Sequence, residues 1–86
     1  MESTATTTED VKAVLVSVLG IEDRAASIDA DTQLLGNLPE LDSMAVLELV
    51  AAFEQRFGVT IDDDEVTAEA FDTLGSLSAM VASKLY

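Results

Sequence analysis

The amino-acid sequence predicts an all-α fold, a small helical bundle of three long helices and one short helix with a long first loop. Three segments place apolar residues at helical spacing, and no segment has the length and alternation of a paired strand. Apolar residues make up 49% of the 86 residues, which is enough for one thin core. We expect a single domain over residues 8–86, preceded by a flexible lead-in of residues 1–7.

The first predicted helix follows a Thr-rich start and ends at Gly20. Thr7 and Asp10 have the spacing of a capping box, which places the start of the helix next to Thr7. Its buried stripe follows the helical repeat and consists of Val11, Val14, Leu15, Val18 and Leu19.

Residues 21–41 lack this periodicity and are predicted to form a long loop. A loop of this length in a compact domain is usually functional or packed down by its own side chains. The apolar residues available for that packing are Ile21, Ile28, Leu34, Leu35, Leu38 and Leu41.

The second helix is predicted to begin near Asp42 and Ser43 and to run to Phe57, with Gly58 as its stop. Its expected buried stripe is Val46, Leu49, Val50, Phe53 and Phe57. Residues 62–71 are expected to contain one or two short helical turns. The last helix should begin within residues 73–76 and bury Leu74, Leu77, Met80, Val81 and Leu85.

The composition excludes several classes of function. Asp and Glu number 17 against 4 Lys and Arg, for a net charge of -13, and His and Cys are absent. A surface this acidic repels nucleic-acid phosphates and anionic membranes. We therefore expect neither nucleic-acid binding nor membrane insertion. Without His or Cys the chain has no Ser-His-Asp triad, no thiol nucleophile, no thiolate metal site and no disulfide. Residues 1–8 have no secretory signal, and no apolar run reaches the roughly 20 residues of a membrane span, so we expect a cytoplasmic protein.

An acidic run at residues 62–65 raises the question of a calcium site. In an EF-hand that began at Asp62, Val66 and Thr67 would replace a ligand and the required glycine. An acidic helix start that screens divalent cations without a defined site is the better interpretation, and we expect no specific metal. Nothing in the sequence indicates an apolar cleft that would tune paired carboxylates for acid-base catalysis, so we do not expect an enzyme.

The second helix has a second apolar face. At 100° per residue from Val46, Met44 lies about 160° and Leu47 about 100° away, and Glu48 lies beside Met44. Either the long loop covers these side chains or they form a docking face for partner proteins.

Ser43 also has two interpretations. Serine is an ordinary residue at a helix start. A serine hydroxyl at a helix N-terminus is equally a place where a phosphodiester is well tolerated.

The segment Leu41-Asp42-Ser43-Met44, with residues 47–54 and Phe57-Gly58-Val59, resembles the acyl or peptidyl carrier proteins. The resemblance covers nearly the whole chain, including residues 73–77, Thr-Leu-Gly-Ser-Leu, at the start of the last helix. It implies that Ser43 carries 4'-phosphopantetheine taken from coenzyme A, and that Asp42 assists the phosphopantetheinyl transferase and its magnesium. The arm's thiol would hold an acyl or aminoacyl group as a thioester.

As the resemblance implies, such a carrier is not catalytic and serves acyl-loading and acyl-transfer enzymes that have basic docking surfaces. The expected docking residues are Met44, Leu47, Glu48, Ala51 and Glu54. We expect a monomer.

Two features depart from the common fatty-acid carriers: Ala45 stands where an acidic residue is frequent, and Gln55-Arg56 interrupt an acidic run. The Leu38-Pro39-Glu40-Leu41 lead is more similar to stand-alone carriers of polyketide, nonribosomal peptide or exopolysaccharide gene sets, so we expect a specialised biosynthetic pathway. The alternative function is an unmodified acidic helical module for protein interaction.

Overall fold

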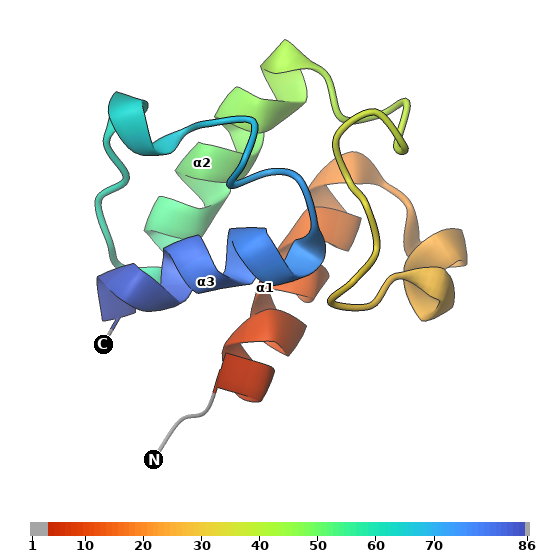
Figure 1. Cartoon of the computed structure of the whole chain (residues 1–86), viewed down its shortest axis with the longest axis horizontal. Coiled ribbons are helices and arrows are strands. Elements are labelled where there is room, and N and C mark those ends of the chain that lie inside the picture. Colours follow the sequence, from red (N-terminus) through yellow and green to blue (C-terminus); the bar gives the residue numbers. More distant parts are fainter. Residues whose placement is uncertain (1–3, 86) are drawn as a thin grey trace.

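The computed structural model describes residues 4–85, with side chains from residue 7 onward. Three α-helices and two short 3₁₀ helices form this part of the chain (Figure 1): α1 at Thr4–Leu19, η1 at Glu22–Ser27, α2 at Ser43–Phe57, η2 at Asp63–Glu65 and α3 at Leu74–Leu85. The predicted all-α bundle with a long first loop is confirmed. In residues 4–85 the β-structure is limited to one isolated bridge, between Gln33 and Thr73.

α1 begins earlier than the sequence predicts. The helix starts at Thr4, and Thr7 is buried within it, so the prediction that Thr7 caps this helix is wrong. Packing of the Thr7 side chain into the core outweighs the weak helix propensity of threonine and extends the helix toward the N-terminus. Residues 4–7 of the expected lead-in therefore belong to α1, and residues 1–3 lie outside the described residues.

The long loop contains a helix that the sequence did not predict. η1 has no buried residue, so it lacks the apolar stripe by which a helix is recognised in a sequence. The expected packing of the loop by its own side chains is confirmed at Ile21, Ile28, Leu34, Leu38 and Leu41, which are buried. Leu35 is the exception and is 38% exposed.

α2 has the predicted bounds because both of its ends carry local signals. Asp42 caps the first turn, and Gly58 follows the helix with a left-handed φ of 67°. The buried residues are Ala45, Leu49 and Phe53, whereas Val46, Val50 and Phe57 are only half-buried. The buried stripe is thus turned by about 60° from the predicted one, at 100° per residue.

The elements of the last part of the chain follow the prediction, but the buried stripe of α3 follows it only in part: Leu74, Leu77 and Val81 are buried, Met80 and Leu85 are half-buried, and Ser78 is buried as well. The expected short helical turn is η2, and α3 begins at Leu74, where the Thr73 hydroxyl accepts the Ser76 N–H and the Ser76 hydroxyl accepts the Thr73 N–H, each at 3.0 Å. α1 packs against both α2 and α3, so the core lies around it. None of the helices in residues 4–85 has the length and apolar character of a membrane span.

Candidate functional site

The start of α2 places Ser43 at the surface. Ser43 is the first residue of the helix and is exposed. Asp42 caps the helix: its carboxylate Oδ1 accepts the Ala45 N–H at 2.8 Å, and its carbonyl oxygen accepts the Val46 N–H at 2.9 Å. The Ser43 hydroxyl has no hydrogen-bond partner within residues 4–85. The local sequence therefore presents a free hydroxyl beside the positive end of a helix dipole.

The other described serines are placed differently. Four of them donate their hydroxyls to backbone carbonyl oxygens: Ser27, Ser76, Ser78 and Ser83. Ser17 is exposed but lies inside α1, where the backbone N–H groups are used by the helix itself. Among the serines of residues 4–85, Ser43 alone combines an exposed free hydroxyl with a helix N-terminus, so it fits a covalently bound phosphate group.

An apolar groove of about 290 Å³ lies beside Ser43. Leu35 and Val46 line one part of it, and the segment between η2 and α3 provides the rest through Val66, Thr67, Ala68 and Phe71. An extended organic arm attached to Ser43 would have apolar surface next to it. The walls of this groove come from three segments that are distant in the chain, so no single stretch of sequence predicts it.

The outer face of α2, formed by Met44, Leu47, Glu48 and Ala51, is open to solvent. Met44 and Leu47 are each 64% exposed, so the long loop does not cover them as one interpretation proposed. Glu48 and Ala51 are exposed on the same helix. Large apolar groups in the open beside a carboxylate are typical of a protein-binding surface.

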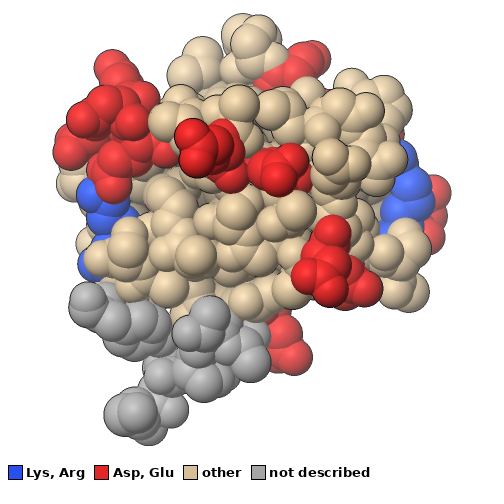
Figure 2. Space-filling view, viewed as in Figure 1, with Lys and Arg blue, Asp and Glu red and all other residues tan. Residues whose placement is uncertain are grey.

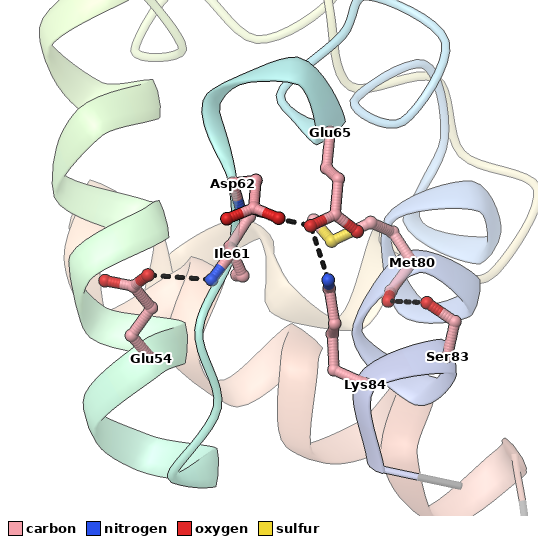
Figure 3. A network of polar contacts seen from close by, with 7 residues as sticks. All are labelled: Glu54, Ile61, Asp62, Glu65, Met80, Ser83 and Lys84. Atoms are coloured by element: carbon pink, nitrogen blue, oxygen red, sulfur yellow. Dashed lines mark hydrogen bonds and ion pairs between the residues drawn. The ribbon is translucent and has the colours of Figure 1, made fainter.

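The Glu54 side chain is less exposed than the sequence suggests. It is half-buried, and its Oε2 accepts the backbone N–H of Ile61 at 2.8 Å (Figure 3). This bond ties the segment after α2 back to the helix. Glu54 therefore has a structural role in addition to any contact with a partner.

A second groove, of about 330 Å³, lies between the end of α1 and the start of α2. Its apolar walls are Val18, Leu19, Met44 and Ala45, and its acidic residues are Glu40, Asp42 and Glu48. It adjoins the outer face of α2. Carboxylates beside apolar side chains give this end of the molecule the chemistry of a site for basic partners.

Within the acidic run of residues 62–65, the Glu65 carboxylate stabilises η2. Glu65 accepts the Asp62 N–H at 3.0 Å and pairs with Lys84 of α3 (Figure 3). Lys84 lowers the pKa of Glu65, and Glu65 raises the pKa of Lys84. Figure 2 shows acidic side chains gathered over η2. Within the described residues no group of three or more His, Cys, Asp or Glu is arranged to hold a metal ion.

A further ion pair joins Arg24 of η1 to Glu40. The hydrogen bond from Arg24 lowers the pKa of Glu40, and the same contact raises the pKa of Arg24. No local pattern indicates this pair, because its members lie 16 positions apart in the chain.

Comparisons with known proteins agree with this arrangement. A family model described as "Phosphopantetheine attachment site" matches residues 9–81. The acyl carrier protein of Petrotoga mobilis is 32% identical over 77 residues, which cover 90% of this chain and 85% of that protein. The acyl carrier protein of Zymomonas mobilis is 41% identical over 61 residues, covering 70% of this chain and 73% of that protein.

A solved structure has the same fold. The solution structure of a holo acyl carrier protein from Nitrosomonas europaea superposes with a TM-score of 0.84 at 46% identity. The match covers 91% of this chain and 94% of that one. Fold and sequence thus point to the same family.

Proposed function

Because the chain belongs to the acyl carrier protein family, whose members are non-catalytic carriers with covalently bound 4'-phosphopantetheine, we propose that Ser43 is the attachment residue. The observation that carries this proposal is the free, exposed Ser43 hydroxyl at the capped start of α2. When bound, the group supplies a terminal thiol that holds an acyl or aminoacyl group as a thioester.

Asp42 is the second residue of the proposed site. Its Oδ1 holds the Ala45 N–H and so keeps the first turn of α2 in shape, while Oδ2 has no partner within residues 4–85. That free oxygen is available to the modifying transferase and its magnesium. Asp42 would thus fix the position of Ser43 and also contribute to the encounter with the transferase.

The partners are a phosphopantetheinyl transferase and enzymes that load and transfer acyl groups. We infer that they dock on the outer face of α2 through basic surfaces, with Glu48 facing cationic groups and Met44, Leu47 and Ala51 giving apolar contact. Glu54 lies at the edge of the proposed contact. The net charge of -13 supports this choice of partner, because it attracts basic surfaces over a distance.

We further propose a specialised biosynthetic pathway, such as polyketide, nonribosomal peptide or exopolysaccharide synthesis. Ala45 is 7% exposed and gives α2 no acidic group at that position, and Arg56 pairs with Asp10 at 3.7 Å. Both features change the charge that a general fatty-acid carrier would offer to its enzymes. A monomeric state and a cytoplasmic location are parts of the same proposal, and sedimentation and cell fractionation test them.

Intact mass tests the proposed attachment and separates it from the unmodified interaction module. The protein is incubated with a phosphopantetheinyl transferase, magnesium and coenzyme A, beside Ser43→Ala. We expect one phosphopantetheine mass gain for the wild type and none for the variant, whose helical circular dichroism should stay close to wild type because Asp42, not Ser43, caps the helix and an exposed substitution changes stability by no more than about 0.5 kcal/mol. A mass gain that persists in Ser43→Ala would refute the assignment, and no gain in either protein would favour the interaction module.

A further inference from the structure

The backbone and the side chain of Glu40 both hold the segment that leads into α2. Its carbonyl oxygen accepts the Asp42 N–H at 3.1 Å, and its side chain pairs with Arg24 of η1. Leu38 and Leu41 are buried, and the Leu41 N–H donates to the Leu38 carbonyl oxygen at 3.0 Å. Glu40 is thus a half-buried, charged residue within a tight turn that ends at Asp42.

The Glu40 carboxylate depends on Arg24. One oxygen, Oε2, accepts a hydrogen bond from the Arg24 guanidinium. The other, Oε1, is buried without a hydrogen-bond partner in the described part of the chain. A partly desolvated carboxylate that loses its counter-charge is unfavourable, because neither water nor protein compensates it fully. Without Arg24, we expect the Glu40 side chain to rotate into solvent. The backbone turn that ends at Asp42 should then shift as well.

A shift of this turn would reach Ser43. The Glu40 carbonyl oxygen accepts the Asp42 N–H, and the Asp42 side chain and carbonyl oxygen accept the N–H groups of Ala45 and Val46 in the first turn of α2. Arg24, Glu40 and Asp42 therefore form a chain of contacts from η1 to the helix start. The Arg24 side chain is 19 residues from Ser43 in the sequence but only two contacts from the residue before it.

We propose that Arg24 is a positioning residue for the transfer onto Ser43: by holding Glu40 it sets the turn that places Asp42 and the Ser43 hydroxyl for the transferase. This inference rests on the proposed attachment at Ser43. A competing interpretation starts from the acidic groove, where Glu40 lies with Asp42 and Glu48. There Glu40 would be a docking acid for basic partners, and Arg24 would shield it.

The two interpretations predict opposite effects of Arg24→Ala on modification. The positioning role predicts a kcat/KM about 10-fold lower, mainly through kcat, because a misplaced nucleophile slows transfer while the outer face of α2 is unchanged. The shielding role predicts an equal or faster rate with a lower KM, because a carboxylate is freed for the basic enzyme.

The experiment measures kcat and KM for the carrier as the varied substrate of a phosphopantetheinyl transferase, with the melting temperature of each variant. Arg56→Ala is the charge-matched control, because it also removes one cation but lies at the far end of α2 from Ser43. Its rate should stay near wild type. The exchange Arg24→Glu with Glu40→Arg restores the pair with reversed charges and should recover most of the kcat lost in Arg24→Glu alone.

A slow Arg24→Ala with a rescued double variant supports the inference. A wild-type or faster Arg24→Ala, or a loss that the double variant does not recover while both proteins remain folded, overturns it. If Arg24→Ala fails to fold, the comparison of Arg24→Glu with the folded double variant decides. Failure of the proposed function itself is distinct, because the wild-type protein would then gain no mass.

Discussion

The backbone N–H of Gly75 donates to the carbonyl oxygen of Ala30 at 2.8 Å, and a Cβ on Gly75 would lie 2.9 Å from that oxygen. This contact joins the long loop to the first turn of α3. Two more bonds join the loop to the segment just before α3, from Leu34 N–H to Asp72 O at 2.7 Å and from Leu35 N–H to Phe71 O at 3.2 Å. Because Leu35 and Phe71 line the groove beside Ser43, these bonds shape the site.

Gly75→Ala should therefore destabilise the protein. Helix propensity alone favours alanine by about 1 kcal/mol, whereas the clash with a backbone oxygen that is itself hydrogen-bonded should cost about 1–3 kcal/mol. Urea unfolding followed by circular dichroism measures the net effect. A more stable variant would show that the loop can move away freely from α3.

For α2, local signals in the sequence predict the ends of the helix better than the direction in which its faces point. Asp42 and Gly58 bound α2 correctly because a cap and a left-handed residue act within one turn. The stripe was misplaced because Val46 and Val50 are more apolar than Ala45, yet the small Ala45 is the buried residue. Which side chain is small enough for close helix packing depends on the neighbouring helix, and one segment's periodicity does not contain that information.

The functional site likewise contains residues that one segment of sequence predicts and contacts that it does not predict. Ser43 and the exposed Met44 and Leu47 were identified from one continuous segment. The groove beside Ser43 and the Arg24–Glu40 pair were not, because each brings together parts of the chain that the fold alone places side by side. The spacing of residues within one segment predicts features of a single helix. It does not predict contacts between loops that are distant in the sequence.

The Glu65–Lys84 pair should make stability depend on pH. The pKa of Glu65 is lowered in the folded state, so its contribution is present above the ordinary glutamate value of about 4.3 and is lost as the pH falls through the lower folded value. The pKa of Lys84 is raised, so its contribution is present below about 10.4 and is lost as the pH rises through the folded value.

Glu65→Gln should thus lower the free energy of unfolding at about pH 7, and this loss should shrink at about pH 2.5, because protonation of the wild-type carboxylate removes the same charge. Denaturant titration at the two pH values measures this difference. Glu69→Gln is the control, because Glu69 is exposed and makes no ion pair within residues 4–85. An equal loss for Glu65→Gln at both pH values would mean that the ion pair does not stabilise η2.

Added salt should raise the melting temperature. A net charge of -13 on 86 residues repels itself in the compact state, and ions screen that repulsion. Millimolar magnesium should act in the same way but at lower concentration, without a defined stoichiometry. Scanning and titration calorimetry test both statements, and one tight site at residues 62–65 would contradict them.

Phe53 and Leu47 lie on different sides of α2, about 120° apart at 100° per residue, and should differ in their effect on stability. Phe53 is 0% exposed, so Phe53→Ala should cost on the order of 3 kcal/mol, a large part of the stability of so small a domain. Leu47→Ala removes a side chain already in solvent and should cost no more than about 0.5 kcal/mol. Chemical unfolding of both variants tests the assignment, and similar losses would mean that α2 is turned differently.

Glu48→Lys should separate binding from folding. Glu48 is exposed on the outer face of α2, so the charge reversal should change stability by no more than about 0.5 kcal/mol. Modification by a transferase with a basic docking surface should nevertheless slow at low salt, because the reversal weakens the attraction that brings the proteins together. The difference from wild type should shrink as salt is added.

Glu9→Lys is the matched control, since it makes the same charge change on an exposed residue near the start of α1, away from Ser43. The modification rates of Glu48→Lys and Glu9→Lys are compared with wild type at low and high salt, beside their melting temperatures. If the two variants slow the reaction equally, the effect belongs to the total charge of the molecule. If only Glu48→Lys slows it, at an unchanged melting temperature, partners approach through the outer face of α2.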